Sequence, residues 1–484
     1  MSRRFKLPSH KTKIVCTIGP ASRSESVLRQ MIKNGMSVAR LNFSHGTLAE
    51  HRQDIRLIRS LSTELNRAVT ILVDLPGPKI RIGRLESEPL YLKKGENLTL
   101  TTKNVLGTTR LLSVNYKDLP ESVSKGSLIF LNDGFIQLRV QQVFKDEVNC
   151  KVLIGGPLLS HKGLNIQRTK INIETITSED LNLIDAALKE EIDTFALSFV
   201  EKAEDILKAK DFAQKKGKDI KVAAKIERVE AVKNIEEILA VSEAIMIARG
   251  DLGVQVPLED VPLIQKRIIR QANILGRPVI TATQMLESMT ENTRPTRAEV
   301  ADVANAILDG TDAVMLSEET AVGKYPVEAV TMMAKIASST ENNWRNIRLS
   351  LDLMNHFKNK IGRKKASIED TVSLNVMEAA HMLKPRFILT PTKTGNTPRR
   401  ISRFKPDCWT LAFTSNDKTS KFLAFSYGIY PFCIKNKIDN WPKTIMKFIK
   451  DLKLIKSGER LILTEGLASS PVGGTDSLRI ITVQ

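Results

Sequence analysis

The stretch ARLNFSHG carries three polar side chains that could do chemistry at the end of an apolar run. Arg40, Asn42 and Ser44 are two residues apart, so in an extended chain they project from one face. A cation, an amide and a hydroxyl gathered in this way are poorly explained by packing. We interpret them as part of a site that binds a charged ligand.

Two later stretches add carboxylates. In VAAKIER, Lys225 and Glu227 share one face, and in IARGDLG Asp251 directly follows an apolar run beside two glycines. Glu227 and Asp251 together could hold Mg²⁺, which takes a few carboxylates and several waters. A stabilising ion pair between Lys225 and Glu227 is the alternative, because this spacing usually marks a salt bridge. These residues by themselves leave both interpretations open.

Hydroxyl groups stand at the ends of two more runs. Thr283 ends a run in ITATQML, where its hydroxyl could bond a carboxylate, and Ser317 and Glu319 follow another run in AVMLSEETAVGKYP. The segments GTD and DLGV mark helix starts, and helix N-termini favour anions. Together with the cations, these features predict a pocket for a small phosphorylated carboxylic acid and Mg²⁺.

These side chains need a scaffold that brings strand ends together, and the order of apolar runs predicts one. Eight short β-branched runs recur with amphipathic helical stretches between them: KIVCTIG, SVARLNF, TILVDL, TFALSF, KVAAKI, AIMIAR, PVITAT and AVMLS. Runs of this length fit strands buried on both faces of a parallel sheet. We therefore predict an α/β protein with a TIM-type (β/α)8 barrel, whose active site lies at the C-terminal ends of its strands.

The alternation is interrupted after the third run. Residues 76–160 change to period-2 patterns with turn signals, which predicts an all-β lid domain, a β-barrel, inserted over the barrel mouth. Residues 346–484 alternate helix and strand patterns again and predict a C-terminal α/β domain. The catalytic barrel would then comprise residues 1–75 and 161–345.

Composition limits the class of protein. Hydrophobic residues make up 42% of the 484-residue chain and charged residues 26%, which argues against global disorder. There is no run of eighteen apolar residues and no apolar signal segment at the start, so we expect no membrane association and no secretion. The four cysteines are widely spaced without a CxxC pair, a pattern typical of a reducing compartment. We expect a cytoplasmic protein.

The net charge of +19 is spread unevenly. Residues 351–484 contain 23 Lys and Arg against 11 Asp and Glu, a net charge of +12. Such a region could meet nucleic acid, an anionic membrane surface or small phosphorylated ligands, or it could be an ordinary solvated surface. It shows no helix-turn-helix, zinc or aromatic RNA-binding pattern, so we expect no nucleic-acid partner.

Several stretches resemble the pyruvate kinase family, from about Thr12 to the end of the chain. They are KTKIVCTIGPAS, GMSVARLNFSHG, KIERVEAVKNIEEI, IMIARGDLGVQVP and the block from Ile280 to Val330, which is the most specific. The resemblance is weakest in the inserted β domain and the C-terminal domain. It implies a glycolytic kinase that transfers the phosphoryl group of phosphoenolpyruvate to ADP with Mg²⁺ or Mn²⁺.

The resemblance also implies roles for individual residues. Arg40 and Lys225 would stabilise the moving phosphoryl group, Thr283 would help to protonate the enolate through water, and Glu227 and Asp251 would bind Mg²⁺. The other implied roles are substrate binding at Ala248, Gly250, Asp251, Ser198 and Ser317, nucleotide binding at Asn42, His45 and Arg81, and monovalent-cation binding at Asn42, Ser44 and Asp74.

The sequence departs from the family pattern at several positions. The usual D-T-K-G-P-E after the third run is here Asp74-Leu75-Pro76-Gly77-Pro78-Lys79, so a lysine replaces the glutamate. We hypothesise that the Lys79 ammonium fills the monovalent-cation role, which would make potassium unnecessary; a solvent-facing lysine is the alternative. Glu179 replaces a usual lysine and Glu318 a usual glycine, with consequences that the sequence does not define.

The segment TPTKTGNTPRR predicts a phosphate-binding loop in the C-terminal domain. Its candidate ligands are the backbone and hydroxyl groups of Thr392, Lys393, Thr394, Gly395, Asn396 and Thr397. The matching loop in pyruvate kinases holds the phosphate of an allosteric activator, and the family is usually tetrameric. The alternative is an ordinary helix N-cap formed by Thr394 or Asn396.

Two rival functions remain. A barrel lyase or aldolase of phosphoenolpyruvate would use similar groups, but it gives no reason for the lid or the basic domain. An inactive relative that only binds nucleic acid or a regulator is supported by the charge alone. Such a relative should have lost Lys225, Glu227, Asp251 or Thr283, and all four are present.

Overall fold

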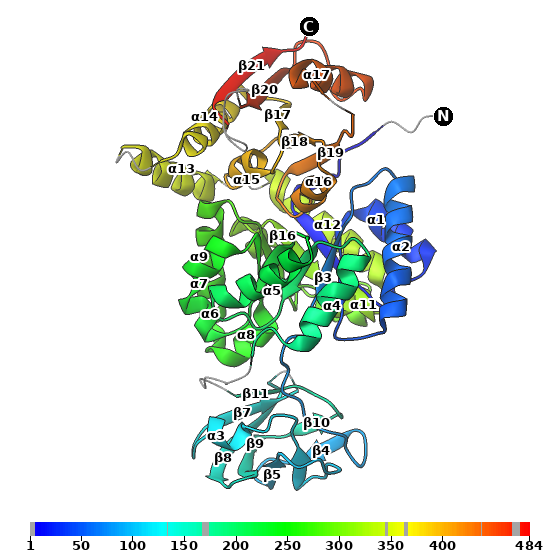
Figure 1. The fold of residues 1–484 in the computed structure, drawn as a ribbon, viewed down its shortest axis with the longest axis vertical. Coiled ribbons are helices and arrows are strands. Elements are labelled where there is room, and N and C mark those ends of the chain that lie inside the picture. The colour runs from blue at the N-terminus through cyan, green and yellow to red at the C-terminus, as the bar shows by residue number, and fades with distance from the viewer. Residues whose placement is uncertain are drawn as a thin grey trace.

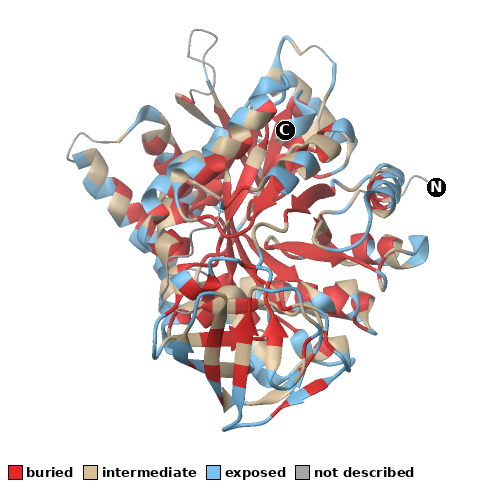
Figure 2. Cartoon of the chain, turned by 60° about the horizontal axis from the view of Figure 1, so that its bottom comes forward, coloured by how far each residue is buried: buried red, intermediate tan, exposed pale blue. Residues whose placement is uncertain are grey.

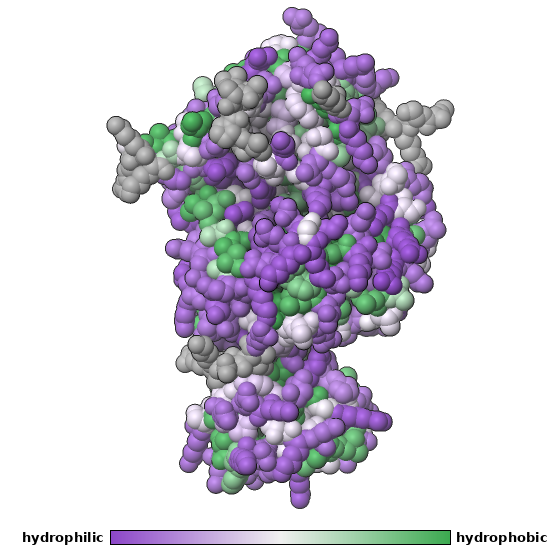
Figure 3. Space-filling view, in the orientation of Figure 1, coloured by the Kyte–Doolittle hydropathy of each residue, from purple (hydrophilic) through white to green (hydrophobic). Residues whose placement is uncertain are grey.

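The computed structural model describes residues 5–132, 134–166, 174–343, 347–362, 366–436, 438–466 and 475–484. Figure 1 shows three parts in a row, with the barrel between the inserted lid and the C-terminal domain. The surface view of Figure 3 is mostly hydrophilic on this face, and a narrow neck joins the lid to the barrel. Among the described helices, none combines the length and apolar character needed to cross a bilayer.

The predicted eight-stranded parallel barrel is confirmed, and every predicted run forms one of its strands. The strands close in the order β1-β16-β15-β14-β13-β12-β3-β2. Their bounds are β1 (Lys13–Ile18), β2 (Met36–Asn42), β3 (Thr70–Asp74), β12 (Thr194–Leu197), β13 (Lys221–Ile226), β14 (Ala244–Ala248), β15 (Val279–Ala282) and β16 (Ala313–Leu316).

Helices surround this barrel. They are α1 (Glu25–Asn34), α2 (Leu48–Glu64), α4 (Ser178–Lys189), α5 (Ala203–Lys215), α6 (Val229–Lys233), α7 (Ile235–Val241), α8 (Arg249–Gln255), α9 (Val261–Leu275), α10 (Arg297–Leu308), α11 (Glu318–Ala321) and α12 (Pro326–Asn343). Three of them begin at a threonine that forms a capping box, namely Thr47, Thr177 and Thr296. These caps satisfy N–H groups that would otherwise lack partners, so the sequence itself marks where the helices start.

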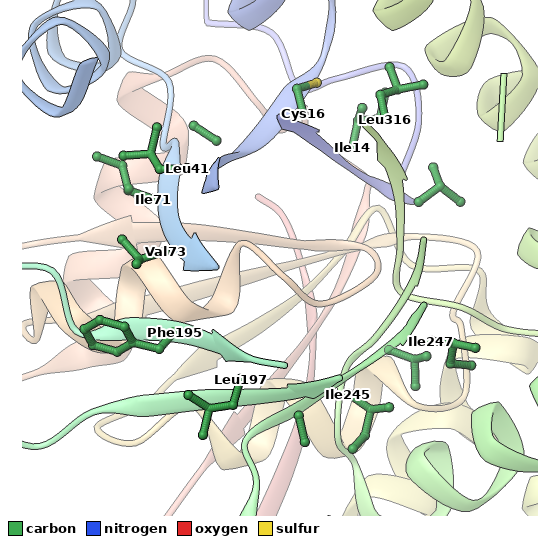
Figure 4. Close-up of a cluster of buried hydrophobic side chains, with 14 of the residues drawn as sticks. Ile14, Cys16, Leu41, Ile71, Val73, Phe195, Leu197, Ile245, Ile247 and Leu316 are labelled. Atoms are coloured by element: carbon green, nitrogen blue, oxygen red, sulfur yellow. The ribbon is translucent and has the colours of Figure 1, made fainter. Parts of the chain in front are cut away.

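Alternation along the strands separates two apolar layers. Outward residues such as Ile14, Cys16 and Leu41 pack between strands and helices, as Figure 4 shows. Inward residues such as Val15 and Val38 form a second cluster inside the barrel, which also contains Phe422 and Phe425 of the C-terminal domain. The buried strands form the centre of the molecule in Figure 2. The barrel interior is therefore filled with side chains and closed by the C-terminal domain.

The inserted all-β domain follows the third barrel strand, as predicted. Its main sheet has the order β11-β7-β8-β9-β5-β6, and β10 pairs with β4 in a second, two-stranded sheet, so it is an open half-barrel rather than a closed one. The elements are β4 (Leu90–Leu92), β5 (Asn97–Thr101), β6 (Leu111–Ser113), α3 (Leu119–Ser122), β7 (Leu128–Leu131), β8 (Ile136–Val143), β9 (Glu147–Ile154), β10 (Gly156–Leu158) and β11 (Leu164–Ile166).

The C-terminal part is the predicted α/β domain, with a sheet in the order β19-β18-β17-β20-β21 whose last strand is antiparallel. Its elements are α13 (Ile347–Gly362), α14 (Ile368–Leu383), β17 (Phe387–Pro391), α15 (Asn396–Ser402), β18 (Trp409–Thr414), α16 (Asp417–Leu423), β19 (Ile429–Cys433), α17 (Trp441–Asp451), β20 (Arg460–Glu465) and β21 (Ser477–Thr482). It covers the N-terminal ends of the barrel strands, opposite the lid (Figure 1).

Candidate active site

A cavity of about 570 Å³ lies at the C-terminal ends of the barrel strands, where the barrel meets the lid. The sequence predicted most of the polar residues that line it. These are Arg40, Asn42, His45, Lys79, Arg81, Lys225, Glu227, Asp251, Thr283 and Ser317, and the predicted Ala248 lines the cavity with them. Four other predicted residues, Ser44, Asp74, Ser198 and Gly250, lie behind this lining and contact it.

Arg40 is held at two points of its guanidinium. Its Nε donates to Asp74 Oδ2 at 2.7 Å, and its Nη1 donates to Thr17 Oγ1 at 2.8 Å. Thr17 and Arg40 are register partners on β1 and β2, while Asp74 ends β3. Three neighbouring strands therefore determine how one arginine faces the cavity.

Lys225 is surrounded by acceptors. Its Nζ lies 2.9 Å from Glu227 Oε1 and 3.4 Å from Asp74 Oδ1, and it donates to Ser198 Oγ at 2.7 Å. Its side chain is 12% exposed, whereas those of Asp74 and Glu227 are 1% exposed. The ion pair that the sequence left as an alternative is present, but it is buried beside the cavity instead of lying on the surface.

Burial and charge compete in setting the pKa of each of these groups. Burial alone would lower the pKa of Lys225, but Asp74 and Glu227 outweigh it and raise that pKa. Burial alone would raise the pKa of Asp74, but Lys225 and Arg40 hold it below its usual range. The lysine is thus a fixed cation and the aspartate a fixed anion.

Glu227 and Asp251 have the chemistry of a divalent-cation site. Burial raises the pKa of Glu227, the Lys225 charge opposes this, and the neighbouring charge of Asp251 raises it further. Glu227 Oε2 accepts from the Phe199 backbone N–H at 2.7 Å, while the structure gives the described Asp251 side chain no hydrogen bond or ion pair. The described residues contain no cluster of three or more such ligands. This pair fits Mg²⁺, which takes few carboxylates and completes its shell with water and substrate oxygens.

The loop after β15 holds Thr283 in a strained conformation. Its φ is +68°, a left-handed value that a β-branched residue rarely adopts. The Thr283 hydroxyl accepts from the Gly250 N–H at 2.8 Å, and its carbonyl accepts from Arg249 Nη2 at 2.8 Å. The Gly250 N–H is therefore already engaged, although the family resemblance implied that it faces the substrate. Strain of this kind persists where the surroundings hold a side chain in place for function.

Ser317 presents an unsatisfied hydroxyl beside the same cavity. Its Oγ is buried and lacks a hydrogen-bond partner within the described part of the chain. Its backbone N–H donates to Glu319 Oε2 at 2.6 Å, and Glu319 Oε1 accepts from the Leu286 N–H at 3.0 Å. Glu319 thus ties the end of β16 to the loop that carries Thr283.

The wall near the lid is cationic. Burial lowers the pKa of His45, and the nearby charges of Arg81, Lys79 and Arg40 lower it further, so this imidazole favours the neutral form. Arg81 Nη1 donates to the carbonyl of His161 in the lid at 2.8 Å. Lys79 is exposed, lines the cavity and has no carboxylate within ion-pair distance among the residues described. This wall is suited to an anionic ligand such as a nucleotide diphosphate.

The predicted effector loop lies apart from this cavity, in the C-terminal domain. Thr392 Oγ1 accepts from the Gly395 N–H at 2.9 Å, and Thr397 bonds Thr475. Gly395, with φ +80°, is the N-cap of α15, and no side chain caps this helix. The alternative of an N-cap by Thr394 or Asn396 is therefore wrong, because the turn requires a left-handed residue at the cap position and glycine adopts it without strain.

Sequence reasoning missed several residues of the site. Thr17 lies near the end of a predicted strand and points inward, a signal that alternation could have revealed. Phe199, with φ +57°, supplies the N–H that holds Glu227, and no sequence pattern announces this. From the lid, His161, Lys162 and Asn165 line the cavity, and only the packing of the lid over the barrel brings them there.

Comparison with known proteins agrees with this geometry. The family model described as the pyruvate kinase barrel domain matches residues 9–330, and the pyruvate kinase alpha/beta domain matches residues 370–481. The chain belongs to the pyruvate kinase family. The rival assignment to a lyase or aldolase is thereby excluded.

Individual relatives cover nearly the whole chain. A pyruvate kinase of Thermococcus litoralis is 49% identical over 484 residues, covering 99% of this chain and all of the relative. A pyruvate kinase of Geobacillus stearothermophilus is 43% identical, covering 98% of this chain and 80% of the relative. A crystal structure of a pyruvate kinase from Cryptosporidium parvum superposes with a TM-score of 0.89 at 34% identity, over 98% of this chain and 97% of that one.

Proposed function

We propose that the cavity transfers the phosphoryl group of phosphoenolpyruvate to ADP, giving pyruvate and ATP. One observation carries this assignment. Lys225 and Arg40 place two fixed cations side by side at the cavity, both anchored by Asp74, with the carboxylates of Glu227 and Asp251 next to them. This is the charge pattern that a loose phosphoryl transition state needs.

The side chains divide the work by position. Arg40 and Lys225 bind and orient the phosphoryl group, and Lys225 acts as a cation instead of an acid, because its raised pKa keeps its proton on Nζ. Glu227 and Asp251 would hold Mg²⁺ or Mn²⁺, which when bound neutralises charge on the phosphate and enolate oxygens. The hydroxyls of Thr283 and Ser317 lie where they can orient a water that gives its proton to the enolate carbon.

The nucleotide is placed on the cationic wall. His45, Arg81 and Asn42 line the cavity, and Arg81 bonds the carbonyl of His161 from the lid, so the diphosphate of ADP would meet positive charge there. The lid residue Lys162 adds a further cation to the same wall. Closure of the lid would then exclude water from the reaction.

We further propose that the enzyme does not need potassium. Asn42 and Asp74 are register partners, and Ser44 donates its N–H to Asn42 Oδ1 at 3.2 Å, so the three predicted cation ligands lie together. Lys79 reaches the same cavity as an unpaired ammonium, a compact charge that can stand in for K⁺.

Two assays test these assignments. Wild-type protein should form pyruvate from phosphoenolpyruvate, ADP and Mg²⁺ in tetramethylammonium buffer, and added KCl should change the rate little. Lys79→Glu should create a potassium requirement, whereas Lys93→Glu, an exposed charge reversal on the lid, should not. Failure of the wild type in both buffers would refute the kinase, and a Lys79→Glu enzyme still indifferent to potassium would refute only the Lys79 role.

The remaining assignments concern regulation, oligomeric state, cellular location and domain limits. A phosphorylated activator would bind at residues 392–397, where Lys393 and Thr394 are exposed and Gly395 leaves the cap open. Replacing Lys393 and Thr394 by alanine should abolish activation by sugar phosphates while leaving the basal rate unchanged. A homotetramer and a cytoplasmic location complete the proposal, and size-exclusion chromatography tests the assembly. The predicted domain limits are 1–75 with 161–345, 76–160 and 346–484. Because β11 (Leu164–Ile166) pairs with β7 of the lid sheet, we place the end of the lid after Ile166 instead of at 160, which limited proteolysis can test.

A further inference from the structure

The buried hydroxyl of Thr17 forms hydrogen bonds with both neighbouring strands of the barrel. Thr17 stands near the end of β1, is 4% exposed and lines the cavity. Its Oγ1 donates to the carbonyl of Leu316 on β16 at 3.0 Å and accepts from Arg40 Nη1 on β2 at 2.8 Å. One hydroxyl thus links two neighbouring strands to the arginine that faces the phosphoryl group.

The valence of a hydroxyl makes this arrangement directional. A threonine has one O–H to donate, and Leu316 takes it, because a carbonyl can only accept. The lone pairs of Oγ1 must then point away from Leu316, toward Arg40. Thr17 therefore acts as an acceptor for the Arg40 guanidinium.

The contact also decides which edge of Arg40 stays free. Asp74 takes Nε and Thr17 takes Nη1, and the structure gives Nη2 no partner among the described residues. Two anchors on one planar group fix both its position and its rotation. The Nη2 edge of Arg40 therefore faces the cavity in one orientation. A fixed orientation of this kind is needed to bind a phosphoryl oxygen during transfer.

We propose that Thr17 is a positioning residue that sets the orientation of Arg40 for phosphoryl transfer. This inference rests on the proposed function, because it assigns Arg40 to the phosphoryl group. It goes further by making the reaction depend on a hydroxyl that acts through its hydrogen bond to Arg40.

The backbone around Thr17 is held independently of its side chain. The Thr17 carbonyl accepts from Thr320 Oγ1 at 2.9 Å, and β1 pairs with β2 on one side and β16 on the other. Thr17→Val keeps the shape of the side chain and removes only the hydroxyl, so we expect it to fold. Thr17→Ser keeps the hydroxyl and removes the methyl group.

The test compares these variants with a matched control. Thr464 lies buried on β20 and donates its hydroxyl to Leu389 on the neighbouring strand, but it lies in the C-terminal domain away from the cavity. We expect Thr17→Val to lower kcat/KM for phosphoenolpyruvate about 10- to 100-fold, through both kcat and the affinity for phosphoenolpyruvate, since a hydrogen bond to a charged group is lost. Thr17→Ser and Thr464→Val should stay within about threefold of the wild type.

A double-mutant cycle separates positioning from general damage. In an Arg40→Met background, Thr17→Val should change kcat/KM less than twofold, because the group that Thr17 orients is gone. An equal loss with and without Arg40, or a Thr17→Ser enzyme as impaired as Thr17→Val, would overturn the proposal. Calorimetric measurement of phosphoenolpyruvate binding to the same four proteins gives this cycle without turnover. If the wild type bound phosphoenolpyruvate but formed no pyruvate, the proposed kinase activity would be refuted, and the role of Thr17 could still be tested by binding.

Discussion

The two ends of the barrel both bury a lysine against carboxylates, but they differ in what surrounds the charges. At the C-terminal end, Lys225 lies between Glu227 and Asp74 and is 12% exposed to the cavity. At the N-terminal end, Lys405 of the C-terminal domain lies 2.9 Å from Asp312 and is 1% exposed. The first lysine faces space that a ligand can enter, and the second faces only protein.

At the N-terminal end of the barrel, which the C-terminal domain closes, backbone groups of both domains bind Asp312 and Lys13. Asp312 accepts from the N–H groups of Tyr427 and Val279, both at 3.0 Å, and Lys13 donates to the carbonyl of Ile429 at 2.6 Å. Burial lowers the pKa of Lys13 to about 7, despite the opposing charges of Glu341 and Asp312. Charges at this end therefore dock one domain on another.

At the C-terminal end of the barrel, which is open to the cavity, several polar groups lack a partner within the part of the chain that the structure describes. Asp251 and one edge of Arg40 have no protein partner among the described residues, the Ser317 hydroxyl is buried and unpaired, and Thr283 is strained. Unsatisfied groups at a cavity lower stability but are ready to bind a ligand. The same residue types thus serve docking where another domain covers them and binding where they face a cavity.

The largest effect should come from Lys225→Met. We expect kcat to fall at least about 1,000-fold, because a cation aimed at the transition state is removed. The melting temperature should fall less than in a variant of the closed end, since water can reach the freed carboxylates through the cavity. Lys221→Met, at the opposite end of the same strand, is the control and should keep its activity. Near-normal turnover by Lys225→Met would contradict the assignment of the open end.

A second variant breaks the docking end. Lys405→Met leaves Asp312 buried without its cation, which should lower the free energy of unfolding by about 3–5 kcal/mol. Thermal and urea unfolding measure this loss, and Lys418→Met, an exposed lysine of the same domain, should leave stability unchanged. If Lys405→Met and Lys418→Met had the same stability, Lys405 would not hold the domains together.

The smallest expected effect is a change in stability with pH that comes from His10, at the closed end of the barrel. Burial lowers the pKa of His10, whose Nδ1 lies 2.7 Å from the Thr12 carbonyl at the closed end. Because the folded pKa is below the unfolded value, the unfolded chain takes up this proton first on acidification. The stability that neutral His10 contributes is therefore full above pH 6.5 and is lost as pH falls below it.

Urea midpoints at pH 7.5 and 5.5 check this sign. The wild type should lose more stability between these values than His10→Gln, whose amide can still bond Thr12 but does not titrate. His381→Gln changes an exposed histidine and should behave as the wild type does. A His10→Gln protein with the same pH dependence as the wild type would show that His10 does not report on the closed end.

Most of the fold was predictable because local patterns encode it. The eight barrel strands match eight apolar runs, and the break after the third run marks the lid. The lid sheet is an open half-barrel, which strand patterns cannot reveal, because closure depends on pairing between distant edges. The C-terminal α/β domain was predictable for the same reason as the barrel, because helix and strand patterns alternate along the chain. The Gly395 cap of α15 was not predicted, because it depends on the left-handed backbone conformation at that residue.

The candidate site was predictable where alternation places side chains at strand ends. Arg40, Lys225, Glu227 and Asp251 stand where a parallel barrel must gather them, so spacing and fold class suffice to bring them together. Spacing could not show that Asp74 anchors both cations, because these contacts join strands far apart in the chain. It also could not show that Lys405 of the C-terminal domain meets Asp312 at the other end of the barrel, because the two residues belong to different domains.

The sequence by itself determined the class of fold, the set of polar strand-end residues and the family, because periodicity, spacing and motif are local properties. The tertiary structure alone decided which charges meet, which are closed off by another domain and which stay open to a ligand. The Thr17 hydroxyl, the strained Thr283 and the docking pair of Lys405 with Asp312 belong to this second group. Their roles depend on neighbours that lie far away in sequence and on how much water those neighbours exclude.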